Sequence, residues 1–221
     1  DGPARAVVFT GSGRAFSAGV DLWRVLNGGP EYGRRFLPAL VEAFEAVFNA
    51  GKPVVAAVNG HAIAGGCILV SGCDHRIMGD AGRIGVTEHA VGVPFPVSAL
   101  EILRFALGDR LARQAVFSAE AYGPAEALER GFVDELADSA ELLPRAIATA
   151  RRLATSTPAD TFRVTKRLLR GEVNERLARL RPAADAETAR LWEDRVRDGS
   201  IRAYMERVTL RAAGGPRGPL R

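Results

Sequence analysis

Two short runs rich in β-branched residues each lead directly into a glycine-containing loop, and this pattern most constrains the fold of the chain. The first run occupies residues 5–10 and precedes Gly11-Ser12-Gly13, and the second occupies 54–58 and precedes Asn59-Gly60. Apolar runs of this length that end at glycine are typical of buried strands. Loops at strand ends are where proteins usually place binding and catalytic groups. The sequence therefore predicts an α/β fold that carries its chemistry in these loops.

Helical periodicity fills most of the remaining chain. Helices are expected over 36–48 and 65–72, and short strands over 74–78 and 83–86. Strand and helix thus alternate through the first part of the chain, as in a layered α/β core. Beyond residue 96 the pattern is helical, with helices expected over 100–107, 110–117, 124–130, 142–155, 159–169 and 172–211. The last stretch is amphipathic and needs a partner surface.

The composition limits the kinds of ligand and the cellular environment that suit this chain. The 30 basic and 26 acidic residues give a formal charge of +4, and only Lys52 and Lys166 among the bases are lysines. This excess permits an anionic ligand but falls short of a dedicated nucleic-acid surface. The longest apolar run, 62–70, is too short to span a membrane. Cys67 and Cys73 lack CxxC spacing, so we expect buried thiols in a reducing compartment, and a cytoplasmic protein.

Several catalytic motifs are absent from the sequence. Phe16 stands where a dinucleotide-binding fingerprint needs its third glycine, and no Walker loop occurs. No serine lies in a Gly-x-Ser-x-Gly elbow. His61, His75 and His89 have no metal-ligand spacing, so we expect no metal site.

Two loops of small residues remain, 16–21 and 62–67. Small side chains let a ligand approach the backbone, and each loop leads into a helix whose first N–H groups lack internal partners. Two such N–H groups aimed at one point form an oxyanion hole. The alternative is that the glycines only permit tight turns and close packing.

Five segments in order resemble the enoyl-CoA hydratase/isomerase family, the crotonases: RAFSAGVDL (14–22), KPVVAAVNG (52–60), AGGC (64–67), CDHR (73–76) and ERGFVD (129–134). The resemblance implies a spiral of ββα turns, a helical C-terminal region that builds trimers or paired trimers, and an acyl-CoA thioester substrate with no separate cofactor. We therefore divide the chain into a core at 1–155, which lacks the family's first strands, and a C-terminal oligomerisation region at 156–221.

The resemblance also implies the site residues. By position, the oxyanion donors are the backbone N–H groups of Val20 and Gly65. The Ala18 carbonyl would face the adenine of coenzyme A, and Arg14 would approach its phosphates. Three apolar side chains would line the acyl pocket: Leu22, Ile68 and Phe95.

A few positions distinguish the reactions of this family. Hydratases carry two catalytic glutamates, whereas this chain has Ile68 at the first position and Glu88 at the second. Pro96 and Phe95 stand where other members place an aspartate. The pattern is most similar to that of Δ3,Δ2-enoyl-CoA isomerases, in which one glutamate moves a proton from C2 to C4. We expect Ile68, Val91 and Phe95 to keep the Glu88 carboxylate dry and strongly basic.

Other hypotheses stay open. The chain could be an enoyl-CoA hydratase that uses Glu88 alone, a non-catalytic acyl-CoA binder, or an RNA-binding protein, the last motivated only by the basic balance. His61 and His89 are expected to be packing or supporting residues. Asp21 and Asp74 are expected to cap the turns that follow them.

Overall fold

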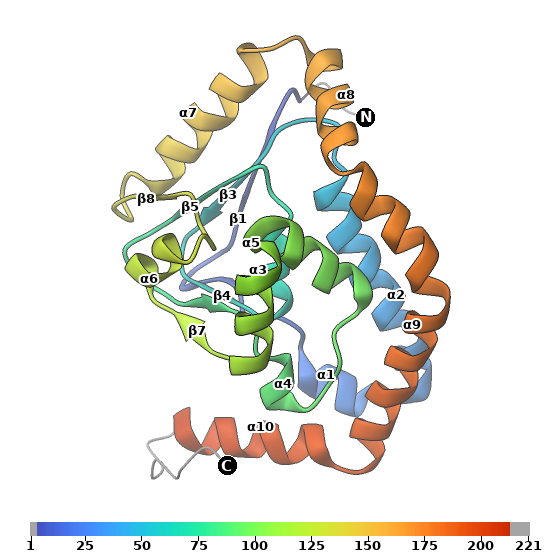
Figure 1. The fold of residues 1–221 in the computed structure, drawn as a ribbon. Coiled ribbons are helices and arrows are strands. Elements are labelled where there is room, and N and C mark those ends of the chain that lie inside the picture. The colour runs from blue at the N-terminus through green and yellow to red at the C-terminus, as the bar shows by residue number, and fades with distance from the viewer. Residues whose placement is uncertain (1–3, 213–221) are drawn as a thin grey trace.

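The computed structural model describes residues 4–212, and its strands form two four-stranded sheets (Figure 1). The strands of the first sheet are all parallel: β1 (Val7–Thr10), β3 (Val54–Val58), β5 (His75–Met78) and β8 (Glu135–Leu136). In the second sheet the last strand runs antiparallel to its neighbour: β2 (Ala15–Ser17), β4 (His61–Ile63), β6 (Ile84–Gly85) and β7 (Ala121–Tyr122).

The first six strands alternate between the two sheets. Along the chain β1 leads to β2, β3 to β4 and β5 to β6, and one or more helices follow each pair. In the first sheet Val8 pairs with Val55, which in turn pairs with His75 on the other side. This repetition of strand, strand and helix is the ββα spiral that the resemblance implied, so the predicted fold class is confirmed.

The helices fall into a core set and a C-terminal set. The core set comprises α1 (Leu22–Asn27), α2 (Gly29–Phe48), α3 (Gly65–Ser71), α4 (Glu88–Val91), α5 (Val97–Ser118), α6 (Pro124–Glu129) and α7 (Leu142–Thr155). The C-terminal set comprises α8 (Ala159–Leu169), α9 (Gly171–Arg197) and α10 (Ser200–Ala212). Figure 1 shows α9 alongside α2, and α10 crossing next to α4 and α1. Within residues 4–212, no helix combines the length and apolar character needed to cross a membrane.

Strand β3 lies at the centre of the core. Its residues are at most 3% exposed, because helices cover both of its faces. Val54, Ala56 and Val58 pack into a cluster with side chains of α2, α3 and α5, whereas Val55 and Ala57 pack with side chains of α7. A parallel strand that is buried on both faces has a continuous run of apolar residues in its sequence. This is why β3 could be predicted from the sequence.

The helix boundaries differ from the sequence prediction where glycines or short strands intervene. The two helices expected over 100–117 form one element, α5, with a kink at Gly108 (φ 73°). The single helix expected over 172–211 is broken at Gly199 (φ 81°) into α9 and α10. The loops expected over 16–21 and 62–67 contain parts of β2 and β4, which are too short to show alternation.

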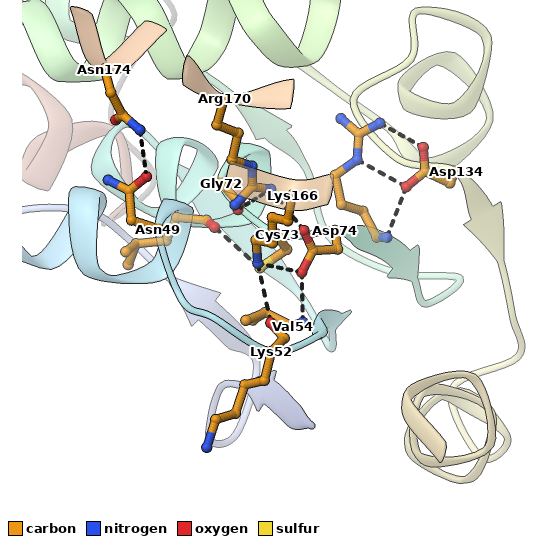
Figure 2. Close-up of polar contacts among 12 residues, drawn as sticks. Asn49, Lys52, Val54, Gly72, Cys73, Asp74, Asp134, Lys166, Arg170 and Asn174 are labelled. Atoms are coloured by element: carbon orange, nitrogen blue, oxygen red, sulfur yellow. Dashed lines mark hydrogen bonds and ion pairs between the residues drawn. The ribbon is translucent and has the colours of Figure 1, made fainter. Parts of the chain in front are cut away.

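Buried ion pairs fasten the C-terminal helices to the core (Figure 2). The Asp74 carboxylate accepts hydrogen bonds from Lys166 Nζ at 2.6 Å, from Arg170 Nη2 at 2.8 Å and from the Val54 N–H at 2.8 Å. The prediction that Asp74 caps the turn after it is therefore wrong, because two cations of the C-terminal region and β3 occupy its oxygens. Asp21, by contrast, caps α1 as predicted, accepting from the Arg24 N–H at 3.0 Å.

Candidate active site

The two loops predicted to carry the chemistry come into direct contact. A Cβ atom on Gly19, whose φ is +87°, would lie 2.9 Å from the Ile63 carbonyl oxygen and 3.6 Å from the Gly65 backbone nitrogen. A Cβ atom on Gly66 would lie 2.4 Å from the Ser17 carbonyl oxygen. Pairing of β2 with β4 brings these loops together, and glycine at both positions permits their close approach.

Val20 and Gly65, the predicted oxyanion donors, lie on these contacting loops. Gly65 is the first residue of α3, where backbone N–H groups have no intrahelical acceptor. In the part of the chain that the structure describes, neither N–H has a hydrogen-bond partner. The preceding residue, Ala64, has φ 54° and ψ −121°, a conformation that L-residues rarely adopt. A hydrogen bond of 2.8 Å from the Ala64 N–H to the Gly85 carbonyl ties this strained turn to β6.

Glu88 begins α4, shortly after β6, and its carboxylate is withdrawn from solvent. Oε2 is buried and has no hydrogen-bond partner among the described residues. Burial raises the pKa of Glu88 to about 7, against the opposing effect of backbone hydrogen bonds at Glu88 and Thr87. A general base is most effective when its pKa lies near the working pH. The carboxylate is thus suited to accept and return a proton at neutral pH.

The side chains expected around this carboxylate are apolar and buried. Ile68, Phe95 and Val91 are 1%, 6% and 9% exposed. Burial raises the pKa of the Cys67 thiol well above its usual range, and the negative charge of Glu88 adds to the effect, so α3 lies close to Glu88. No other carboxylate of residues 4–212 contributes to the shift at Glu88.

Helix α10 covers the region around Glu88, which the sequence did not predict. Its Ile201 is fully buried and its Tyr204 is partly buried, in a cluster that also holds Val20 and Leu22. Burial raises the pKa of Tyr204; Arg207 opposes the shift, and the charge of Glu88 adds to it. The phenol therefore lies within electrostatic reach of the carboxylate. The two residues are far apart in the chain, and only the packing of α10 on α4 and α1 reveals their proximity.

The remaining predicted residues lie around these loops. Arg14 and Ala18 are exposed and flank β2, where a ligand can reach them. His89 is exposed, and its ring lies edge-on to the Phe95 ring with the two ring centroids 5.6 Å apart, in agreement with a packing role. His61 is also exposed. Within residues 4–212 no group of three or more His, Cys, Asp or Glu side chains is arranged to hold a metal ion.

An apolar cavity of about 430 Å³ lies between α1, α2 and α9. Val25, Leu37 and Trp192 line it, and they belong to the same apolar cluster as Val20 and Leu22. Glu88 does not line this cavity. The cavity therefore adjoins the predicted oxyanion loop through that cluster, but none of the predicted acyl-pocket residues, Leu22, Ile68 and Phe95, lines it.

Comparison with known proteins places the chain in a family. Residues 1–211 match the model of the enoyl-CoA hydratase/isomerase family. The chain belongs to this family. A Thermus thermophilus protein provisionally named enoyl-CoA hydratase is 36% identical over 94% of this chain and 82% of its own length. Human mitochondrial enoyl-CoA delta isomerase 1 is 29% identical over 87% of this chain and 64% of its own length.

Solved structures agree on the crotonase fold. The crystal structure of human mitochondrial Δ3-Δ2-enoyl-CoA isomerase matches with a TM-score of 0.84 and 28% identity, over 93% of this chain and 80% of that one. A Mycobacterium tuberculosis structure described as an enoyl-CoA hydratase matches with a TM-score of 0.71 and 30% identity, over 94% of this chain and 78% of that one. Both hydratases and isomerases are thus among the relatives of this enoyl-CoA hydratase/isomerase enzyme.

Proposed function

We propose that this protein is an isomerase that converts 3-enoyl-CoA into trans-2-enoyl-CoA, with Glu88 as its single catalytic base. The observation that carries the proposal is the half-buried Glu88 side chain, whose Oε2 is buried without a hydrogen-bond partner among the described residues and whose pKa is about 7. It lies on a site where Ile68 stands in place of a second acid. Adding water to a double bond requires a group that holds the water. Moving a double bond requires only one base that accepts a proton and returns it.

The proposed reaction has two proton transfers and needs no other reactant. Glu88 removes a proton from C2, the electron pair shifts toward the thioester, and the negative charge rests on the thioester oxygen. The N–H groups of Val20 and Gly65 donate hydrogen bonds to that oxygen, and one such donor contributes about 3 kcal/mol to transition-state stabilisation. Protonated Glu88 then delivers the same proton to C4, and the double bond comes to lie between C2 and C3.

The substrate is proposed to bind with its thioester between the two loops. Arg14 would contact the phosphates of coenzyme A and the Ala18 carbonyl its adenine. The acyl group would pass Leu22, Ile68 and Phe95, and its tail would enter the apolar cavity of about 430 Å³. Aromatic walls, Phe36 and Trp192, make that cavity fit a bulky or medium-length tail.

The assembly is proposed to be a homotrimer or a pair of trimers built by the C-terminal region. Apolar side chains of α8 and α10 are exposed in the single chain, which supports burial against another copy: Val164, Leu168, Leu169, Val208 and Leu210. We further propose that no cofactor is needed, because coenzyme A is part of the substrate, and that the protein acts in the cytoplasm.

The second candidate function is enoyl-CoA hydratase, which the names of several relatives favour. Rates with trans-3-hexenoyl-CoA and with crotonyl-CoA separate the two activities. We expect isomerisation of the first to be faster than hydration of the second. Faster hydration would overturn the proposal.

The Glu88→Gln variant separates catalysis from simple acyl-CoA binding. We expect it to lower the isomerisation rate by about 10³-fold, in the range by which general acid–base groups act. Glu42→Gln, at an exposed glutamate of α2, is the matched control and should leave the rate unchanged. Equal rates for wild type and Glu88→Gln would remove the role assigned to Glu88.

A further inference from the structure

A second cavity, of about 340 Å³, lies between the C-terminal end of α2, one side of α8 and the start of α9. We call it the basic pocket and define it by six of its lining residues: Asn49, Arg163, Lys166, Arg167, Arg170 and Asn174. Figure 1 shows α8 at the end of the molecule remote from α4 and α10. The basic pocket is therefore separate from the site around Glu88.

The charges that line the basic pocket are all positive. Four of its residues are basic and none is acidic. Lys166 and Arg170 share the carboxylate of Asp74, which lies outside the lining and offsets one charge. Arg163 and Arg167, one helical turn apart on α8, have no ion-pair partner within residues 4–212. The pocket thus carries an excess of about three positive charges, which an anion would neutralise.

One of these cations has a buried donor that nothing satisfies. Arg170 is 4% exposed; its guanidinium donates to Asp74 and to the Gly72 carbonyl, and it stacks on Phe48 at 4.2 Å. Its Nη1 is buried without a partner in the described chain. Nη1 is closed off from the pocket as well as from solvent, so Arg170 contributes positive charge to the basic pocket and not a free donor.

Polar amides complete the rim of the basic pocket. The Asn174 side-chain amide donates to Asn49 Oδ1 at 3.0 Å, which fixes both side chains (Figure 2). This contact leaves the Asn49 amide nitrogen as an additional donor. A phosphate group offers several acceptor oxygens and two negative charges, and guanidinium groups match its geometry.

We propose that the basic pocket binds the phosphate group of a small soluble metabolite. Arg163 and Arg167 would supply exposed charge and hydrogen-bond donors, and Arg170 would add buried positive charge. This site is independent of the proposed isomerase activity, because its residues lie away from Glu88 and the oxyanion loops.

Calorimetric titration of the whole protein with inorganic phosphate tests this proposal. The ionic strength is held constant, and the phosphate concentration is kept in the millimolar range. At such concentrations the general stabilising effect of phosphate, which comes from its exclusion from the protein surface, is small. We expect saturable binding of one phosphate per chain, and an affinity at least about tenfold lower in Arg163→Gln/Arg167→Gln. Lys166 and Arg170 are left intact because Asp74 depends on them.

The matched control is Arg151→Gln/Arg152→Gln on α7, which removes two exposed charges outside the pocket and should keep wild-type affinity. Absence of saturable binding, wild-type affinity in Arg163→Gln/Arg167→Gln, or equal loss in both double variants would overturn the proposal. So would binding to phosphatidylglycerol vesicles without binding of free phosphate, because the ligand would then be a membrane.

Discussion

At the scale of single residues, Glu88 couples stability to the proposed chemistry. Its side chain is half-buried with Oε2 withdrawn from solvent, and its pKa is raised from 4.5 to about 7. The folded protein therefore holds the proton more tightly than the unfolded chain does. The resulting stabilisation is fully present below pH 4.5 and is lost as the pH rises through about 7.

Replacing Glu88 by glutamine should remove this pH dependence. We expect Glu88→Gln to be more stable than wild type above pH 7, by on the order of 2 to 3 kcal/mol, because the amide carries no charge to bury. Urea unfolding between pH 4.5 and 8 measures the difference. In Glu42→Gln, at an exposed site, unfolding should follow wild type at every pH. Parallel curves for Glu88→Gln and wild type would contradict this explanation.

The same pKa sets the pH dependence of activity. Only the ionised carboxylate can remove the C2 proton, so kcat/KM for isomerisation should rise through about pH 7 and level off above it. Initial rates with 3-hexenoyl-CoA between pH 5 and 9 check this expectation. A rate that falls over the same interval would mean that a protonated group starts the reaction.

At the scale of elements, α10 closes the region around Glu88. Ile201 anchors this helix and is fully buried against the cluster that contains Val20 and Trp192. Ile201→Ala should cost about 2 to 4 kcal/mol, release α10 and lower the isomerisation rate, because water would reach the carboxylate. Hydrogen–deuterium exchange of the α10 backbone amides and the isomerisation rate are measured on the same variant. Arg202→Ala, at an exposed polar residue of the same helix, should change neither. A rate unaffected by Ile201→Ala would show that α10 plays no part.

The ion pairs of Asp74 join α8 to the central strands. Asp74→Asn leaves Lys166 and Arg170 as buried cations without a counter-charge, so we expect a loss of about 3 to 5 kcal/mol in the free energy of unfolding. Urea denaturation measures it. Asp109→Asn breaks an exposed pair with Arg104, and should lower the stability far less than Asp74→Asn does, because solvent screens this pair. Similar losses in the two variants would contradict the importance of burial.

Elements with a strong local pattern could be predicted, and elements fixed by distant contacts could not. β3, α7 and α8 match the sequence prediction, because burial on both faces or a clear helical period marks them. β2 and β4 have three residues each and show no period. Asp74 and its partner Lys166 are 92 residues apart, so their contact depends on tertiary packing.

At the scale of the whole molecule, the spiral of ββα turns explains how the candidate site is assembled. Each turn places a strand in both sheets, so the ends of β2, β4 and β6 bring Val20, Gly65 and Glu88 into one region. The family pattern predicts these residues, but it could not predict the cover supplied by α10 or the position of Tyr204. Helix α10 begins after Gly199, whose positive φ ends α9, and the hydrophobic periodicity of the sequence continues across this glycine without marking the break.

The central claim is that Glu88 alone moves one proton from C2 to C4. Mass spectrometry of the product formed from 3-hexenoyl-CoA in deuterated water tests it most directly. We predict trans-2-hexenoyl-CoA in which a measurable share of molecules has kept the transferred protium at C4. A 3-hydroxyacyl product that accumulates faster than the 2-enoyl product, or complete deuteration at C4, would contradict the single-base shuttle.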